Sequence, residues 1–135
     1  MPANESKELP LRTDDDIVRM RQAVRSIAIE TGLSLVDQTK LVTAASELGR
    51  NTRIYGGGGS VKIEKVDNGI RRGVRLTFED HGTGIPNVEL ALKDGYTTGG
   101  GLGLGLGGSK RLCNEFEIDS RPGEGTRVMI ARWKP

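Results

Sequence analysis

The sequence predicts an α+β fold, a two-layer sandwich in which a mixed or antiparallel sheet packs on helices. Two observations predict it. Apolar residues recur at helical spacing through the first third of the chain, and later stretches alternate apolar and polar residues as the strands of hairpins do. Helices that come in a run and strands that come in hairpins do not form repeating βαβ units, so we expect helices against one sheet.

The first elements have local signals at their ends. Residues 8–12 alternate weakly and predict an edge strand, because Pro10 would remove a hydrogen bond from the ladder of a central strand. Thr13 stands before three aspartates at 14–16, the pattern of a helix N-cap with an acidic first turn. We expect this helix to end at Gly32, which is placed like a C-cap.

A second helix follows. Ser34 with Asp37 three residues later resembles a capping arrangement. Apolar positions then continue at helical spacing towards Tyr55, where four glycines at 56–59 end the helix.

The second half of the chain reads as strands and loops. Residues 60–80 predict a β-hairpin that turns at Asn68 and Gly69 and ends at Asp80. Residues 81–106 carry little periodicity and many glycines, which is typical of a functional or mobile loop. After this loop we expect a short helix over 107–113, a strand with Phe116 and Ile118, a turn over 121–125 and a last strand over 128–133.

Length and composition bound the function. The 135 residues correspond to a single domain, residues 1–135, since domains commonly have roughly 100–200 residues. Apolar residues make up 35% and charged residues 28%, enough for one modest core. The 20 Lys and Arg against 18 Asp and Glu leave a formal charge of +2. Nucleic acid is therefore disfavoured as a partner, because its binding needs clustered basic residues. The oligomeric state is left open.

The chain also carries signs of its compartment. Cys113 is the only cysteine and cannot form an internal disulfide, which fits a reducing cytoplasm. The first ten residues lack the pattern of a signal peptide, and no apolar run approaches the roughly 20 residues that span a bilayer. We expect a cytoplasmic protein that does not enter a membrane.

Glycine is concentrated in two places. It accounts for 20 of 135 residues, and eight of these glycines lie between positions 95 and 108. Gly103, Gly105 and Gly108 satisfy G-x-G-x-x-G, yet no strand leads into them, as a dinucleotide-binding fold requires. A glycine run that leads into a helix does suit a phosphate chain. A flexible linker is the alternative, although regularly spaced leucines between the glycines argue against it.

Two further patterns place carboxylates where they could bind a ligand. Glu47 and Asn51 are four residues apart and so share one face of a helix. A carboxylate with an amide oxygen suits Mg²⁺, and a solvated helix face is the alternative. Asp80 follows a strand and precedes Gly82 and Gly84, so it could accept a hydrogen bond from an exocyclic amine. A plain Asp-x-Gly turn is the alternative there.

The order of these motifs resembles the Bergerat ATP-binding fold of the GHKL family, which includes gyrase, Hsp90, histidine kinases and MutL. The motifs run Glu-x-x-x-Asn on a helix, Asp-x-Gly-x-Gly after a strand, a loop ending in Gly-Leu-Gly-Leu-Gly-Leu, and then Gly-x-Gly-Thr. Four segments, at 46–51, 79–86, 94–100 and 110–112, are similar to the small switch serine kinases of the stressosome. The resemblance covers nearly the whole chain.

The resemblance implies ATP and Mg²⁺ as cofactors and gives individual residues a role. Asp80 would accept the amino hydrogen of adenine, and Thr126 would support that edge of the ring. Asn51 would ligate Mg²⁺. Glu47 would be the general base that takes the proton from an incoming serine hydroxyl.

The same resemblance assigns the glycines and one cation. Gly82 and Gly84 would allow the backbone to approach the nucleotide closely. Lys110 would contact either the phosphates or a partner protein, with a solvated charge as the alternative. Gly49 lies inside the second helix, and we expect its small size to serve packing beneath the nucleotide. The glycines that would belong to the lid over the phosphates are Gly101, Gly103 and Gly105.

As a function, the resemblance implies an Mg-ATP-dependent protein serine kinase. Its substrate would be a STAS-domain scaffold or antagonist, after which it would switch partner and activate a PP2C-type phosphatase in a stress-signalling cascade. The alternative is an anti-sigma factor that sequesters a sigma subunit and phosphorylates its own antagonist. The catalytic part of a histidine kinase is a weaker alternative, because it needs a phosphoacceptor histidine and the chain has only His81.

Overall fold

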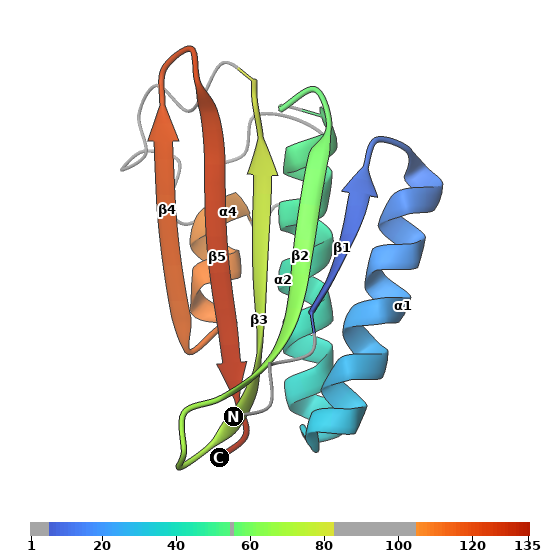
Figure 1. The fold of residues 1–135 in the computed structure, drawn as a ribbon, viewed down its shortest axis with the longest axis vertical. Coiled ribbons are helices and arrows are strands. Elements are labelled where there is room, and N and C mark those ends of the chain that lie inside the picture. The colour runs from blue at the N-terminus through green and yellow to red at the C-terminus, as the bar shows by residue number, and fades with distance from the viewer. Residues whose placement is uncertain (1–5, 55, 83–104) are drawn as a thin grey trace.

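The computed structural model describes residues 6–54, 56–82 and 105–135, which form one sheet and a layer of helices (Figure 1). In chain order the elements are β1 (Ser6–Leu11), α1 (Asp14–Thr31), α2 (Leu35–Ile54), β2 (Gly59–Asp67), β3 (Arg72–Asp80), α4 (Gly105–Arg111), β4 (Glu115–Arg121) and β5 (Gly125–Trp133).

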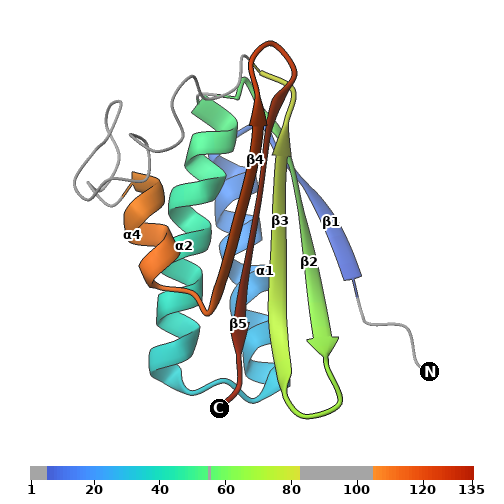
Figure 2. The same ribbon diagram turned by 90° about the vertical axis from the view of Figure 1, so that its left-hand side faces the viewer.

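The five strands lie in the order β1-β2-β3-β5-β4, and each neighbouring pair is antiparallel. The helices lie together on one face of this sheet, as Figure 2 shows. The predicted two-layer α+β sandwich is confirmed, with an antiparallel sheet. β1 lies at an edge, where the proline at position 10 predicted it. Among the described helices, none combines the length and the apolar character needed to cross a membrane.

The predicted helix caps are present. The hydroxyl of Thr13 accepts the N–H of Asp16 at 3.1 Å, and the Asp16 carboxylate accepts the N–H of Thr13 at 3.1 Å. This reciprocal pair is a capping box. α1 ends at Gly32, whose φ of 91° is in the left-handed region that favours glycine. The start of α2 is capped as well, because the hydroxyl of Ser34 accepts the N–H of Asp37 at 3.1 Å.

The core lies between the helices and the face of the sheet that they cover, here called the inner face. The strands contribute alternate residues to it: Val61, Ile63, Val74, Leu76, Phe78, Val128 and Ile130. The helices contribute Met20, Val24, Ala28, Leu41, Ala44, Ala45 and Leu48. This alternation fixes which strand residues face the helices, and it puts Asp80 and Thr126 on the inner face.

Gly49 serves the contact between the two long helices. A Cβ atom at this position would lie 2.9 Å from Cε of Met20 and 3.3 Å from Cδ1 of Ile17. Both neighbours belong to α1, and Gly49 is buried. Its small size therefore allows α1 and α2 to approach closely, whereas the sequence suggested packing beneath a nucleotide.

Two boundaries differ slightly from those that the sequence predicts. The turn between β2 and β3 spans four residues, 68–71, and the side chain of Asn68 accepts the N–H groups of Ile70 and Arg71 at 2.9 and 2.7 Å. α4 starts at Gly105, two residues before its expected start, and ends at Arg111. Helix ends commonly shift by this much.

Candidate active site

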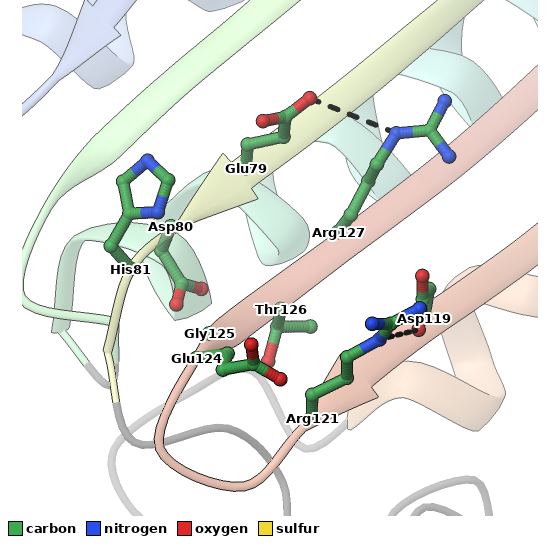
Figure 3. A pocket seen from close by; sticks show the side chains of 9 residues that line it. All are labelled: Glu79, Asp80, His81, Asp119, Arg121, Glu124, Gly125, Thr126 and Arg127. Atoms are coloured by element: carbon green, nitrogen blue, oxygen red, sulfur yellow. Dashed lines mark ion pairs between the residues drawn. The ribbon is translucent and has the colours of Figure 1, made fainter.

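Two of the predicted site residues, Asp80 and Thr126, lie together at one end of the sheet, where β3 ends and β5 begins (Figure 3). Asp80 is the last residue of β3 and lies directly opposite Thr126 in the antiparallel ladder. The C-terminal end of α2 reaches the same place. The N–H of Gly56 donates to the carbonyl of Asn51 at 3.2 Å, and Gly56 itself lies against the carboxyl group of Asp80.

Three glycines let the backbone crowd around Asp80. A Cβ atom on Gly56 would overlap the Asp80 carboxylate, and one on Gly125 would overlap the Asp80 carbonyl oxygen. A Cβ atom on Gly82 would lie 2.9 Å from the carbonyl oxygen of Gly56. The N–H of Gly82 donates to Oδ1 of Asp80 at 2.9 Å. The Asp80 carboxylate is thus held by backbone on several sides, and within the described segments its second oxygen remains available to accept a further hydrogen bond.

Thr126 is held by a neighbour that the sequence analysis did not identify. Its hydroxyl lies 2.9 Å from the hydroxyl of Ser120 in β4, and either group can donate. The two residues are paired in the ladder between β4 and β5. The short turn between these strands sets that pairing, so the register of the predicted hairpin was the signal that could have identified Ser120.

A cavity of about 150 Å³ opens beside Asp80 and Thr126. Its rim is charged on the face of the sheet that the helices leave open. There Arg127 pairs with Glu79 at 3.7 Å, and Arg121 pairs with Asp119 at 3.7 Å, as the dashed lines in Figure 3 show. All four of these charged side chains line the cavity together with Asp80 and Thr126, so the cavity opens partly on the face of the sheet that the helices leave open.

Glu47 is the least expected residue of the site, because a carboxylate of this helix would ordinarily face water. Its side chain is only 3% exposed. Among the residues that the structure describes, its Oε1 atom finds no hydrogen-bond partner. Burying an unpaired carboxylate oxygen is costly, so its presence calls for a role. The alternative of a solvated helix face is excluded for Glu47.

Asn51 lies one helical turn beyond Glu47, on the same face of α2, and is half-buried. Together the two side chains offer a carboxylate and an amide oxygen, the hard ligands that Mg²⁺ accepts. The donor set therefore fits a magnesium ion at the C-terminal end of α2, next to the Asp80 end of β3.

Of the remaining predicted residues, two lie on α4 and three lie outside the described segments. Gly105 is the first residue of α4, and Lys110 lies in its last turn with its side chain exposed. Gly84, Gly101 and Gly103 lie outside the described residues. The role of Gly84 in letting the backbone approach the nucleotide, and the roles of the other four near the phosphates, stay predictions.

Three comparisons place this geometry among known proteins. A family model described as histidine kinase-, DNA gyrase B-, and HSP90-like ATPase matches residues 36–135. The serine/threonine-protein kinase RsbT of Bacillus subtilis is 42% identical over 96% of this chain and 98% of its own length. The anti-sigma F factor of Anoxybacillus flavithermus is 32% identical over 83% of this chain and 80% of its own. The crystal structure of the RsbU and RsbW domains of a Mycobacterium tuberculosis protein shares the fold, with a TM-score of 0.65 at 20% identity, and covers 99% of this chain and 34% of that one.

Proposed function

Because the chain belongs to the histidine kinase-, DNA gyrase B- and HSP90-like ATPase family and is an RsbT-like serine/threonine kinase of partner-switching signalling, we propose its substrate and its site. It transfers the γ-phosphoryl group of Mg-ATP to a serine of a STAS-domain scaffold or antagonist. The observation that carries the assignment of the site is the buried Glu47, one of whose oxygens has no partner among the described residues, one turn before Asn51 on the helix whose C-terminal end meets Asp80.

Asp80 and Thr126 bind adenine in this proposal. The free oxygen of Asp80 accepts the amino hydrogen of the ring, since its other oxygen already accepts the N–H of Gly82. Thr126, held by Ser120, supports the same edge of the ring. The close backbone around Asp80 favours a flat ligand, and Gly82 and Gly84 let the chain approach it.

Glu47 and Asn51 serve the transfer. Mg²⁺, when bound, neutralises charge on the phosphates, and Asn51 is the residue that would hold it. Glu47 takes the proton from the serine hydroxyl as the serine oxygen bonds to the γ-phosphorus and the bond from that phosphorus to ADP breaks. The glycines proposed to face the phosphates are Gly101, Gly103 and Gly105, with Lys110 as a nearby cation.

The test uses the purified chain with radiolabelled ATP, Mg²⁺ and cytoplasmic extract of its source. We expect one small protein labelled on serine, and no label with Glu47→Ala, because that variant keeps the nucleotide contacts but lacks the base. Glu79→Gln is the matched control, since Glu79 is the neighbouring carboxylate of β3 but pairs with Arg127 on the face of the sheet opposite Asp80 and the helices. Intact Mg-ATP binding without any labelled protein would contradict the kinase assignment.

Partner switching adds a second step to the proposal. After phosphorylating its STAS-domain substrate, the kinase is released and binds a PP2C-type phosphatase, which it activates in the cytoplasm. Adding the chain to such a phosphatase should raise the rate at which it hydrolyses a phosphoserine substrate. If the phosphatase hydrolyses its substrate at an unchanged rate in a saturating concentration of this protein, the proposed activation is wrong and only the kinase step remains.

A second candidate function is that of an anti-sigma factor. Several relatives at about 30% identity carry this name, among them the anti-sigma F factor of Clostridium beijerinckii. Co-purification of the chain with a sigma subunit would favour this function over the stress-signalling kinase. Co-purification with a STAS-domain protein alone fits both, so labelling of that protein has to accompany the experiment.

A further inference from the structure

Arg132 occupies an unusual position on the inner face of β5. The neighbouring inward positions of this strand, Val128 and Ile130, are buried core residues, and Arg132 pairs across the ladder with the buried Val74. The alternation of the strand would place an apolar side chain here. The arginine side chain is only 15% exposed, so its charge must be satisfied within the protein.

The guanidinium group joins three elements. Its Nη2 and Nε atoms donate to Oδ1 of Asp37 at 2.7 and 3.2 Å, and its Nη1 atom donates to the carbonyl of Leu112 at 2.9 Å. Asp37 lies in the first turn of α2, and Leu112 follows the last residue of α4. The Asp37 side chain is 11% exposed, so this ion pair is largely shielded from water and salt.

α4 needs such an anchor because it has little stability of its own. It has seven residues, and Gly105, Gly107 and Gly108 are three of them. Helices this short are unstable alone, and glycine is among the weakest helix formers. Leu106 and Ser109 are buried against the rest of the protein, and the hydrogen bond from Arg132 fixes the other end.

The anchor lies far from the site but connects its parts. α2 begins near Asp37 and carries Glu47 and Asn51 further along, about 15 and about 21 Å away at the helical rise per residue. α4 begins with Gly105, one of the glycines proposed to face the phosphates. Figure 2 shows α4 beside α2, with both on the same side of β5.

We propose that Arg132 is a positioning residue that fixes α4 against α2 and thereby keeps the two helices in the arrangement that binds Mg-ATP. This inference rests on the proposed function. It predicts that nucleotide affinity depends on a side chain that touches no part of the nucleotide site.

Three variants separate this role from stability alone. Arg132→Met removes all three hydrogen bonds and should weaken Mg-ATP binding about tenfold. Asp37→Asn is the matched control, because it removes the charge of the pair, whereas its amide oxygen can still accept from Arg132 and the bond to the Leu112 carbonyl remains, so its affinity should stay close to that of the parent. Arg132→Lys should restore most of the affinity, since an ammonium group can still donate to both acceptors. Calorimetry at a temperature where all variants are folded measures these affinities.

Cys113 provides a reporter inside the molecule. It is the only cysteine of the chain, it follows Leu112, and burial raises the pKa of its thiol to about 12 while the charge of Arg132 opposes that rise. Loss of the Arg132 charge alone would therefore slow the reaction of this thiol with a disulfide reagent. We expect Cys113 to react faster in Arg132→Met than in the parent or in Asp37→Asn. Because the loss of charge acts in the opposite direction, such an increase in rate would show that the thiol has become less buried at the end of α4.

The parent protein gives a test that needs no variant. If α4 and the nucleotide site are coupled, saturating Mg-ATP must slow the reaction of Cys113, because the coupling is reciprocal. Mg-ATP binding with an unchanged thiol rate, or Arg132→Met with the affinity of the parent, would overturn the role of Arg132 and leave the proposed function intact. A parent protein that does not bind Mg-ATP would overturn both.

Discussion

Asp80 owes its position to residues that have no functional groups of their own. Gly56, Gly82 and Gly125 each bring a backbone segment to within contact of it, and a side chain at any of them would have to displace a neighbour. One oxygen of the carboxylate is occupied by the N–H of Gly82. The recognition of adenine in the proposed function therefore depends on the other carboxylate oxygen, Oδ2, for which no partner is found in the part of the chain that the structure describes.

Asp80→Asn tests that dependence. The amide can present a donor to the amino group of adenine where the carboxylate presented an acceptor, and such mismatched polar groups are strongly rejected. We expect Mg-ATP binding, measured by calorimetry, to be lost. Glu79→Gln changes the adjacent carboxylate on the opposite face and should bind Mg-ATP as the parent does. If Asp80→Asn binds Mg-ATP with the affinity of the parent, then other residues recognise the adenine ring.

Gly49 and Met20 are in contact, so the effects of substituting them on the free energy of unfolding should not be additive. Alanine at 49 improves helix propensity by about 1 kcal/mol, but its Cβ atom would lie 2.9 Å from Cε of Met20. We expect Gly49→Ala to reduce the free energy of unfolding in the parent and to reduce it less, or raise it, in a Met20→Ala background. Urea unfolding of the parent, the two single variants and the double variant should give a coupling energy of about 0.5–3 kcal/mol between the two positions. Additive effects would mean that the helices simply move apart.

At the scale of elements, α1 starts with a complete capping box. Thr13→Ala removes the hydroxyl that accepts the N–H of Asp16 and should lower the free energy of unfolding by about 1 kcal/mol. Ser26→Ala, an exposed position of the same helix, serves as control and should have little effect. Equal effects of the two substitutions in urea unfolding would show that the cap contributes nothing beyond propensity.

Local chemistry explains which elements could be predicted from the sequence. The cap at Thr13, the left-handed residue Gly32 and the turn at Asn68 each depend on neighbours within a few positions, and each was confirmed. The predicted site residues Asp80 and Thr126 do lie opposite each other, but through the pairing of β3 with β5, which joins the two hairpins and connects distant segments of the chain.

The parts that could not be predicted depend on contacts between distant segments. The burial of Glu47 and the direction in which Gly49 packs follow from the placement of α2 against α1 and the sheet. Arg132 occupies a position whose strand pattern calls for an apolar residue, and only the meeting of β5 with α2 and α4 explains it. Periodicity tells which face of an element is inward but not what it meets there.

At the scale of the whole molecule, three carboxylates tie stability to pH. Hydrogen bonds from Arg132 lower the pKa of Asp37, those from Arg75 lower the pKa of Glu64, and the N–H of Arg12 lowers the pKa of Asp16. A lowered pKa in the folded state means that the unfolded chain binds protons first as the pH falls. This stabilisation is complete above the ordinary carboxyl values of 3.8 and 4.5 and is lost as the pH falls through the lowered ones.

The free energy of unfolding should accordingly decrease with falling pH below about 4.5 and show little change from these groups above it. Urea unfolding between pH 3 and pH 7 measures the profile. Asp37→Asn should flatten its acid limb, because one of the three groups no longer titrates. An Asp37→Asn profile parallel to that of the parent would show that Asp37 does not contribute.

The strand order of the sheet also predicts the order in which the strands pair during folding. The hairpins of β2 with β3 and of β4 with β5 join residues close in sequence, but Leu11 of β1 pairs with Gly59 across both long helices. Closing that large loop costs chain entropy before any contact compensates for it. The pairing of β3 with β5 is as distant in sequence, but β1 lies at the edge and has one neighbouring strand only, so we expect β1 to join the sheet last. Leu11→Val should then speed unfolding and leave the folding rate unchanged, as followed by stopped-flow fluorescence of Trp133, the only tryptophan. Slower folding would mean that the edge strand belongs to the nucleus. A late edge strand leaves the ladder edge of β2 open during synthesis, when a second nascent chain could pair with it.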